Sequence, residues 1–220
     1  MQQKFREDYP GEFVVLETRF VNGRKEQKRE WIDNPITNHH ISGRAAVIGS
    51  RIDIHTFHYP RLETHRGGLL GKKRLQTYVA GDIWKDFKAD FAVTLNDTDL
   101  KDSIEAKYTE QNIVYTSASN CIKYPGEFYL IPFYPRLDVL ALPIYLAAFD
   151  GHKEIFMMGY NNETQSGTRN WQADVNQVIG TYPGVQFIFV GVETNIPDLW
   201  RNNRNVRCMD YRKFVTYCDV

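Results

Sequence analysis

The chain has 220 residues and a mass of 25.7 kDa, enough for one full α/β domain with a small appendage. The chain has 27 lysine and arginine residues and 27 aspartate and glutamate residues. This balance excludes a broad positively charged surface of the kind that binds nucleic acid, but not a local charged patch. No apolar run reaches the about 20 residues of a membrane span, and the start, MQQKFREDYPGEF, lacks the apolar core of a signal peptide. We therefore expect a cytoplasmic protein with no membrane span and a small or neutral partner.

The first distinct segment, residues 11–33, predicts a β-hairpin. Two strand-like stretches flank Asn22-Gly23, a dipeptide typical of tight hairpin turns. Partial alternation of apolar and polar residues indicates a half-exposed antiparallel appendage, which could pair with an edge of the main sheet or pack against a second copy in a homo-oligomer. We expect residues 1–43 to form this appendage and residues 44–220 to form the main domain.

From residue 44 onward, short apolar segments alternate with polar or helical stretches, the pattern of a parallel α/β sheet. The candidate strands are RAAVIGS (44–50), RLQTYVA (74–80), FAVTL (91–95), NIVYTS (112–117), EFYLI (127–131), KEIFMMG (153–159) and VQFIFVG (185–191). The helix candidates between them are DIWKDFKAD (82–90), DLKDSIEAKYTE (99–110), RLDVLALPIYLAAF (136–149) and NWQADVNQVIGTYP (170–183). A helical turn, a short strand at 206–209 and a closing helix complete the chain. This order predicts a three-layer, Rossmann-like α/β fold with a mainly parallel sheet.

The stretch from Leu142 to Asn162 shows the pattern most clearly. An apolar helical face leads into Asp150-Gly151, which predicts a left-handed stop, and an uninterrupted apolar run follows at 155–158. Such a run is typical of a strand covered on both faces. Because ligands bind at the carboxyl ends of strands in open α/β sheets, the polar residues that follow are candidates for a site.

The first candidate is the turn after RAAVIG, where Gly49, Ser50 and Arg51 offer backbone N–H groups, a hydroxyl and a guanidinium. This combination suits phosphate, although an ordinary strand-to-loop turn can look the same. The GxGxxG pattern of ordinary dinucleotide-binding proteins is absent.

Asn96 and Asp97, in the run Asn-Asp-Thr-Asp after FAVTL, form the second candidate. An amide and carboxylates can read a sugar hydroxyl, hold a divalent ion or act as a general base. The same residue types also cap helices, and we expect at least one of the four to do so. We interpret Asp97 as the functional carboxylate.

Two further strand ends carry small or polar residues. Thr116 and Ser117 begin a run of hydroxyl residues that permits close approach of a ligand, although a solvated loop would look similar. Tyr160 and Asn161 follow the 153–159 strand. Because all four candidates follow predicted parallel strands, together they predict a polar cleft.

Histidines and cysteines carry weaker signals. His58 and His65 follow the phosphate-turn candidate and could act as a general base or acid, although a surface or capping role is the favoured interpretation. His55-x-x-His58 has no third ligand at a diagnostic spacing, and the three cysteines form no Cys-x-x-Cys pair, so we expect no obligatory metal and interpret the cysteines as packing residues. A glycine-rich basic stretch at 66–74 could close over phosphates or serve as an exposed connection.

The order VIGS, FAVTLND, LPIYLAAFDGHKEIFMMGYNNE and VRCMDYRKF resembles the sialyltransferase-like and MptE-like (6-hydroxymethylpterin diphosphokinase-like) Rossmann-type proteins over roughly residues 44–215. In that family a strand ends in a short Gly-Pro-Ser-type nucleotide-binding turn, and an Ala- and Leu-rich helix leads through a glycine into a strand. Here Gly49-Ser50 lacks the proline, and Tyr160-Asn161 replaces the usual acidic end. The resemblance implies a cleft for a nucleotide-activated donor without an obligatory metal in the sialyltransferase-like branch.

The leading hypothesis is a glycosyltransferase-like enzyme that uses a nucleotide sugar. Gly49, Ser50 and Arg51 would stabilise the diphosphate, Asn96 would read the nucleoside or sugar, and Asp97 or a histidine would deprotonate the acceptor. Two alternatives stay open: a catalytically inactive nucleotide-binding or assembly protein that contacts a protein partner, and a pterin or nucleotide phosphotransferase that requires a divalent ion.

Overall fold

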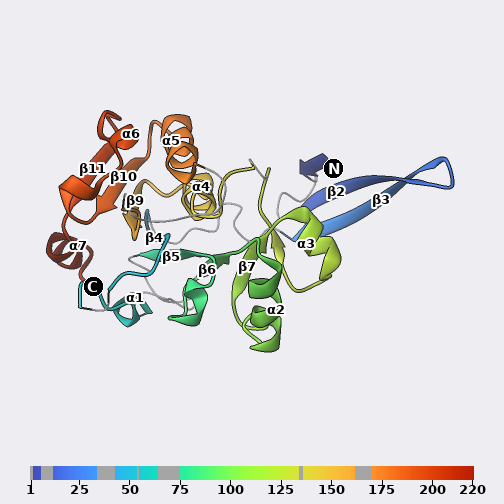
Figure 1. Cartoon of the computed structure of the whole chain (residues 1–220), viewed down its shortest axis with the longest axis horizontal. Helices are drawn as coiled ribbons and strands as arrows, with labels where there is room; N and C mark the ends of the chain where they lie inside the picture. Colours follow the sequence, from blue (N-terminus) through green and yellow to red (C-terminus); the bar gives the residue numbers. More distant parts are fainter. Residues whose placement is uncertain are drawn as a thin grey trace.

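An eight-stranded parallel sheet forms the centre of the molecule (Figure 1). The computed structural model describes residues 2–5, 12–33, 43–53, 55–63, 75–133, 136–161 and 170–220. The strands of the sheet are β4 (Arg44–Ile48), β5 (Gln76–Ala80), β6 (Phe91–Val93), β7 (Ile113–Thr116), β8 (Tyr129–Leu130), β9 (Glu154–Met158), β10 (Gln186–Val190) and β11 (Val206–Met209). Their order is β11-β10-β9-β4-β5-β6-β7-β8, and every neighbouring pair is parallel. The predicted α/β class is confirmed.

Helices cover both faces of this sheet. They are α1 (Pro60–Glu63), α2 (Asp97–Glu105), α3 (Ala118–Lys123), α4 (Leu142–Phe149), α5 (Trp171–Thr181), α6 (Asp198–Arg201) and α7 (Tyr211–Cys218), with 3-10 turns η1 (Ile83–Lys85) and η2 (Glu193–Asn195). One core cluster joins α4, α5 and α6 to the sheet, and a second joins α1, η1, α2, α3 and α7 to the opposite face. In Figure 1, α4 and α5 lie above the strands β4 to β7, and α1 and α2 lie below them.

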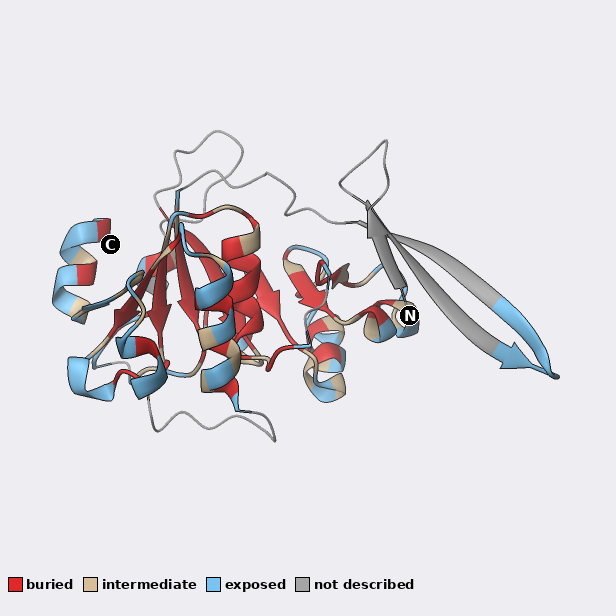
Figure 2. Ribbon diagram, turned by 90° about the horizontal axis from the view of Figure 1, so that it is seen from above, coloured by how far each residue is buried: buried red, intermediate tan, exposed pale blue. Residues whose placement is uncertain are grey.

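The apolar runs of the central strands follow from this three-layer arrangement. In β4, Val47 belongs to the first cluster and Ile48 to the second, and in β9 Met157 and Met158 divide in the same way. Because successive side chains point to opposite faces and helices cover both faces, these strands carry no polar alternation. Figure 2 shows that the central strands and α4 are the most buried part of the fold.

A second, three-stranded antiparallel sheet lies at the amino-terminal end and has the order β1-β2-β3. It consists of β1 (Gln2–Phe5), β2 (Glu12–Val21) and β3 (Arg24–Asp33). The predicted turn is present, because Asn22 and Gly23 both have positive φ, at 51° and 77°. The β2–β3 hairpin projects beyond the β8 edge of the main sheet (Figure 1), and β3 contacts β8 at its base. Strand β1 was not predicted.

Three segments differ from the sequence prediction. Residues 82–90, predicted as a helix, contain only η1, and residues 118–120, for which no helix was predicted, open α3. In the first case Gly81 has positive φ directly after β5, and the apolar side chains Ile83, Trp84 and Phe87 are buried within a short connection to β6. Helix α4 is also shorter than the 136–149 candidate and begins at Leu142, followed by Pro143 in its first turn.

Candidate functional site

The strand order reverses between β4 and β9. The chain builds one half of the sheet outward from β4 to β8, and then returns to β9 and builds the other half through β10 and β11. At such a reversal the connections leave the two central strands in opposite directions, which opens a crevice beyond their carboxyl ends. The residues that follow β4 and β9 therefore lie where an open α/β sheet most often binds a ligand.

A cavity of about 280 Å³ lies at this crevice, beyond β4, β9 and β10. Arg51, Asn161 and Asn195 are polar side chains among the residues that line it, and Phe189 and Val192 contribute an apolar side. Val192 is 63% exposed at the rim, whereas Phe189 is buried. A cavity with an apolar wall and a few polar groups is typical of a small-molecule site.

Gly49 has a packing role that the sequence did not indicate. Its N–H donates to the carbonyl oxygen of Met158 at 3.0 Å, which extends the ladder between β4 and β9. A Cβ at this position would lie 2.5 Å from ring carbons of Tyr160. The hydroxyl of Tyr160 donates to the carbonyl of Leu140 at 2.7 Å, and burial raises the pKa of this phenol well above its usual value, so it remains a donor. Tyr160 thus fills the space above Gly49 and forms the floor of the crevice.

Ser50 joins the two central loops. Its Oγ donates to the carbonyl oxygen of Gly159 at 2.5 Å. Gly159 has a φ of 71°, and a Cβ there would collide with the carbonyl oxygen of Ser50. The close approach of these two backbones therefore requires glycine at position 159.

Arg51 lines the cavity but is already paired. Its Nε donates to Asp86 at 2.8 Å, and its two terminal nitrogens donate to the two carboxylate oxygens of Asp82 at 3.1 Å each. The hydrogen bonds to Asp82 raise the pKa of the guanidinium. These hydrogen bonds fix the orientation of the Arg51 guanidinium, but a bound phosphate would share this guanidinium with the carboxylates of Asp82 and Asp86.

Tyr211, at the start of α7, supplies a hydroxyl that the sequence reasoning missed. It lines the 280 Å³ cavity, and burial raises its pKa to about 12, so the hydroxyl can donate a hydrogen bond at neutral pH. Asn195 was missed in the same way. Both residues follow strands, β10 for Asn195 and β11 for Tyr211, so the strand-end rule that selected Asn161 would also have found them.

The predicted residues after β6 and β7 form a separate group further along the same sheet edge, and they do not line this cavity. Asn96 caps α2, since its side chain accepts from the N–H of Thr98 at 3.0 Å. Ser117 caps α3, where its Oγ accepts from the N–H of Asn120 at 3.4 Å. Thr116 is buried, and its Oγ1 accepts from the side chain of Asn120 at 2.9 Å.

Asp97 is held by three partners. Lys123 forms an ion pair with it, Tyr124 donates to it at 2.7 Å and Lys101 pairs with it at 2.9 Å. The hydrogen bond from Lys123, followed by those from Tyr124 and Lys101, holds the pKa of the Asp97 carboxyl far below its usual value. A carboxylate with so little affinity for a proton is a weak general base.

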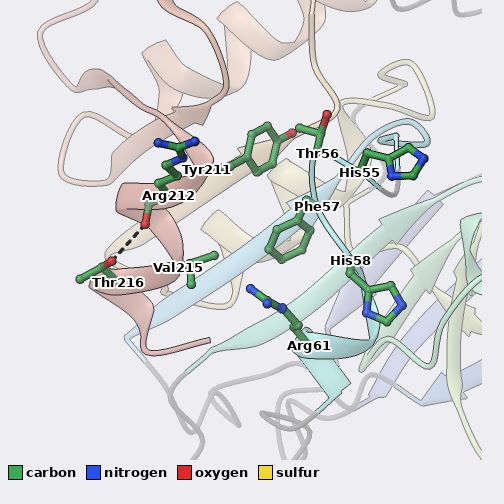
Figure 3. Close-up of a pocket in the computed structure, with 9 residues that line it drawn as sticks. All are labelled: His55, Thr56, Phe57, His58, Arg61, Tyr211, Arg212, Val215 and Thr216. Atoms are coloured by element: carbon green, nitrogen blue, oxygen red, sulfur yellow. Dashed lines mark hydrogen bonds between the residues drawn. The ribbon is translucent and has the colours of Figure 1, made fainter.

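His58 lines a second cavity, of about 430 Å³, that adjoins the first. The two cavities share Thr56 and Tyr211. In Figure 3 the imidazole of His58 points away from α7. His65 and the glycine-rich stretch 66–74 lie outside the described residues. Within the described part of the chain, no cluster of three His, Cys, Asp or Glu side chains could hold a metal ion.

The structure therefore brings together Gly49, Ser50, Arg51, Tyr160 and Asn161 at the reversal of strand order, and it leaves the residues after β6 and β7 apart from them. No family model, no curated protein and no solved structure matches this chain. Among the described helices, none has the length and apolar content needed to cross a bilayer.

Proposed function

We propose that this protein binds a nucleotide-activated sugar in the cavity at the carboxyl ends of β4, β9 and β10 and transfers the sugar to an acceptor. The observation that carries the proposal is the position of this 280 Å³ cavity at the reversal of strand order in a Rossmann-like sheet. The resemblance to sialyltransferase-like proteins, which rests on the sequence, points to the same class of ligand.

The lining of the cavity suits the parts of such a donor. Arg51 is oriented by its two carboxylate partners and lies where it can stabilise a phosphate, while the hydroxyl of Tyr211 can donate to a second oxygen. Asn161 and Asn195 carry amides that can read a base or a sugar. Val192 offers an apolar contact at the rim for the flat face of a base.

In the proposed reaction the acceptor hydroxyl oxygen forms a bond to the anomeric carbon of the sugar, and the bond from that carbon to the phosphate oxygen breaks. The nucleotide leaves with the electron pair, and the hydroxyl proton passes to a base. Because Asp97 lies outside the cavity and its lowered pKa makes it a weak base, the proposal assigns the base to His58, which lines the adjoining cavity and turns its imidazole toward the donor in the reaction.

Binding is tested by the thermal unfolding midpoint in the presence of free nucleotides and nucleotide sugars. A ligand that binds only the folded state stabilises it by roughly 2.7 kcal/mol at a concentration 100-fold above Kd. Asn161→Ala and Asn195→Ala should reduce the shift, whereas Asn202→Ala, at an exposed asparagine outside the cavity, should leave it unchanged. If no nucleotide or nucleotide sugar raises the midpoint, the proposed donor site is wrong.

A second candidate is a nucleotide-binding protein without catalysis that contacts a protein partner, a second copy included. The contacts of Asp97 favour this second candidate, because the carboxylate that was expected to act as the base instead forms ion pairs with two lysines and accepts a hydrogen bond from Tyr124. The two candidates differ in turnover. Release of free nucleotide from a bound donor, slowed by His58→Ala with unchanged donor affinity, supports transfer, whereas donor binding without any release across a panel of acceptors supports the second candidate.

A further inference from the structure

The second cavity, about 430 Å³ in volume, lies between residues 55–61 and α7 (Figure 3). Two arginines from different elements reach it. Arg61, on α1, points toward α7, and Arg212, on α7, lies at the other end of the cavity beside Tyr211. No carboxylate is among the described residues that line it. The cavity therefore has a net positive lining in a chain whose overall charge is zero.

Arg212 differs in its pairing from Arg51, which lines the first cavity. Arg51 is shared by Asp82 and Asp86, whereas Arg212 forms no ion pair with any residue that the structure describes. The nearby acidic residue Asp210 is engaged by Lys213, through both the backbone N–H at 2.8 Å and the ammonium group at 3.7 Å. The guanidinium of Arg212 is exposed and available to a ligand that enters the cavity.

The remaining lining provides an apolar wall and hydroxyl groups. Phe57 is buried, and its ring stacks on that of Tyr211 with centroids 5.7 Å apart. Val215 faces Arg61 across the cavity in Figure 3. Thr56 and Thr216 add hydroxyls, of which that of Thr216 donates to the carbonyl of Arg212 at 3.1 Å and keeps its oxygen as an acceptor. An apolar wall between two cationic ends suits a molecule with a carbon skeleton and an anionic group at each end.

We propose that this cavity is a binding site for a small molecule that carries an oxyanion, a phosphate or a carboxylate, at each end of a short carbon skeleton: Arg61 holds one end, Arg212 holds the other, and Phe57 and Val215 contact the apolar part. The planar guanidinium presents paired N–H donors that match two oxygens of either group. The inference does not depend on the donor site, because Arg61 and Arg212 line only this cavity of the two.

The test is calorimetric titration of the whole chain with inorganic phosphate and, separately, with succinate. We expect at least one of the two anions to bind, and Arg61→Gln and Arg212→Gln each to weaken its binding by about tenfold. Arg207→Gln is the matched control, because it removes the same charge from an exposed position on β11 outside the cavity. Arg212 is exposed, so Arg212→Gln should unfold at the wild-type midpoint, and the unfolding midpoint of Arg61→Gln checks that this variant is folded under the conditions of the titration.

Binding of phosphate alone would assign the site to phosphorylated ligands, and binding of succinate alone to carboxylates; either result supports the proposal. Absence of binding with both anions would overturn it. So would an equal loss of affinity in Arg207→Gln, because that result would show only a general attraction of anions to positive charge. The donor-site variants Asn161→Ala and Asn195→Ala should leave the affinity for these anions unchanged, which separates failure of this site from failure of the proposed function.

Discussion

The contact between Gly49 and Tyr160 is one of two tight constraints at the reversal of strand order, beside that between Gly159 and Ser50. A methyl group at position 49 would lie 2.5 Å from the Tyr160 ring, and that ring cannot retreat freely because its hydroxyl is bonded to Leu140. We expect Gly49→Ala to lower the free energy of unfolding by about 1–3 kcal/mol, the usual cost of overpacking. Urea denaturation measures this loss.

A glycine with open space around it provides the control. Gly43→Ala meets no heavy atom within 4 Å of the new Cβ and should change the unfolding free energy by less than about 0.5 kcal/mol. In a Tyr160→Leu background the cost of Gly49→Ala should shrink, because the two positions are coupled through the ring. A full additive cost in that background would show that the strain lies elsewhere.

Asp97 makes the stability of the protein depend on pH in a defined window. Its folded-state pKa is lowered from the ordinary value of 3.8, chiefly by the hydrogen bond from Lys123, so the carboxylate contributes stability above that value and loses it as the pH falls further. The difference in unfolding midpoint between wild type and Asp97→Asn should therefore be largest at neutral pH and shrink below about pH 4. Lys123→Gln should reduce the same difference, and a difference that stays constant from neutral to acid pH would contradict this account.

At the scale of elements, helix caps explain why sequence alone could not separate ligand-binding residues from structural ones. Asn96 and Ser117 follow strands and precede helices, so a cap and a ligand contact call for the same residue types at the same positions. The sequence predicted that one residue of the 96–99 run would serve as a cap, and Asn96 does. Only the positions of β6 and β7 away from the cavity show which role these residues have here.

Substitution of Asn96 distinguishes its two roles. Asn96→Ala should lower the free energy of unfolding by about 1 kcal/mol, because α2 loses the acceptor for the Thr98 N–H, whereas Asn96→Asp should retain the cap. Chemical denaturation measures both. If Asn96→Asp keeps both the unfolding free energy and the nucleotide affinity of the wild type, Asn96 acts only as a helix cap. If the variant keeps the unfolding free energy but loses nucleotide affinity, Asn96 belongs to the nucleotide site.

The strands were predicted more accurately than the helices. Every candidate strand from 44 to 191 contains an observed strand, because uninterrupted apolar runs report burial on both faces. Helices α3 and η1 are short and are held by packing: Ala118 and Cys121 of α3 and Ile83 and Trp84 of η1 enter the same core cluster. Elements of three to six residues carry too little periodicity to be identified from the sequence.

At the scale of the whole molecule, the order of strands decides which predicted residues meet. The sequence predicted parallel strands, and this is confirmed. The candidate residues that directly follow β4, β6, β7 and β9 therefore lie at one edge of the sheet. It did not predict that β9 would lie beside β4, which brings Asn161 to Arg51 and leaves Asn96 on the far side of β5. The local pattern thus identified polar residues at the strand ends, whereas the long-range pairing of β4 with β9 decided which of these residues meet at the cavity.

The projecting hairpin carries exposed apolar side chains near its tip. Phe20, near its tip, is 76% exposed, beside the half-exposed Val21. If the hairpin mediates association, Phe20→Lys should lower the association constant measured by sedimentation, because the change replaces an apolar contact with a charge. Leu199→Lys, at an apolar residue exposed on α6, is the control and should have no effect. A wild-type chain that stays monomeric at every concentration would contradict a role of the hairpin in self-association.

The same arrangement predicts that the α/β sheet folds without the amino-terminal sheet. The eight parallel strands and their helices have two core clusters of their own, and β1, β2 and β3 form a separate three-stranded sheet. A chain that begins at Gly43 should therefore keep the far-ultraviolet circular dichroism signal of the α/β sheet and its helices, and lose only the contribution of the removed strands. Its free energy of unfolding should fall by less than about 1 kcal/mol. Circular dichroism with urea denaturation measures both quantities. A larger loss would show that the contact of β3 with β8 supports the short edge strand of the main sheet, and that the hairpin is part of one folding unit with it.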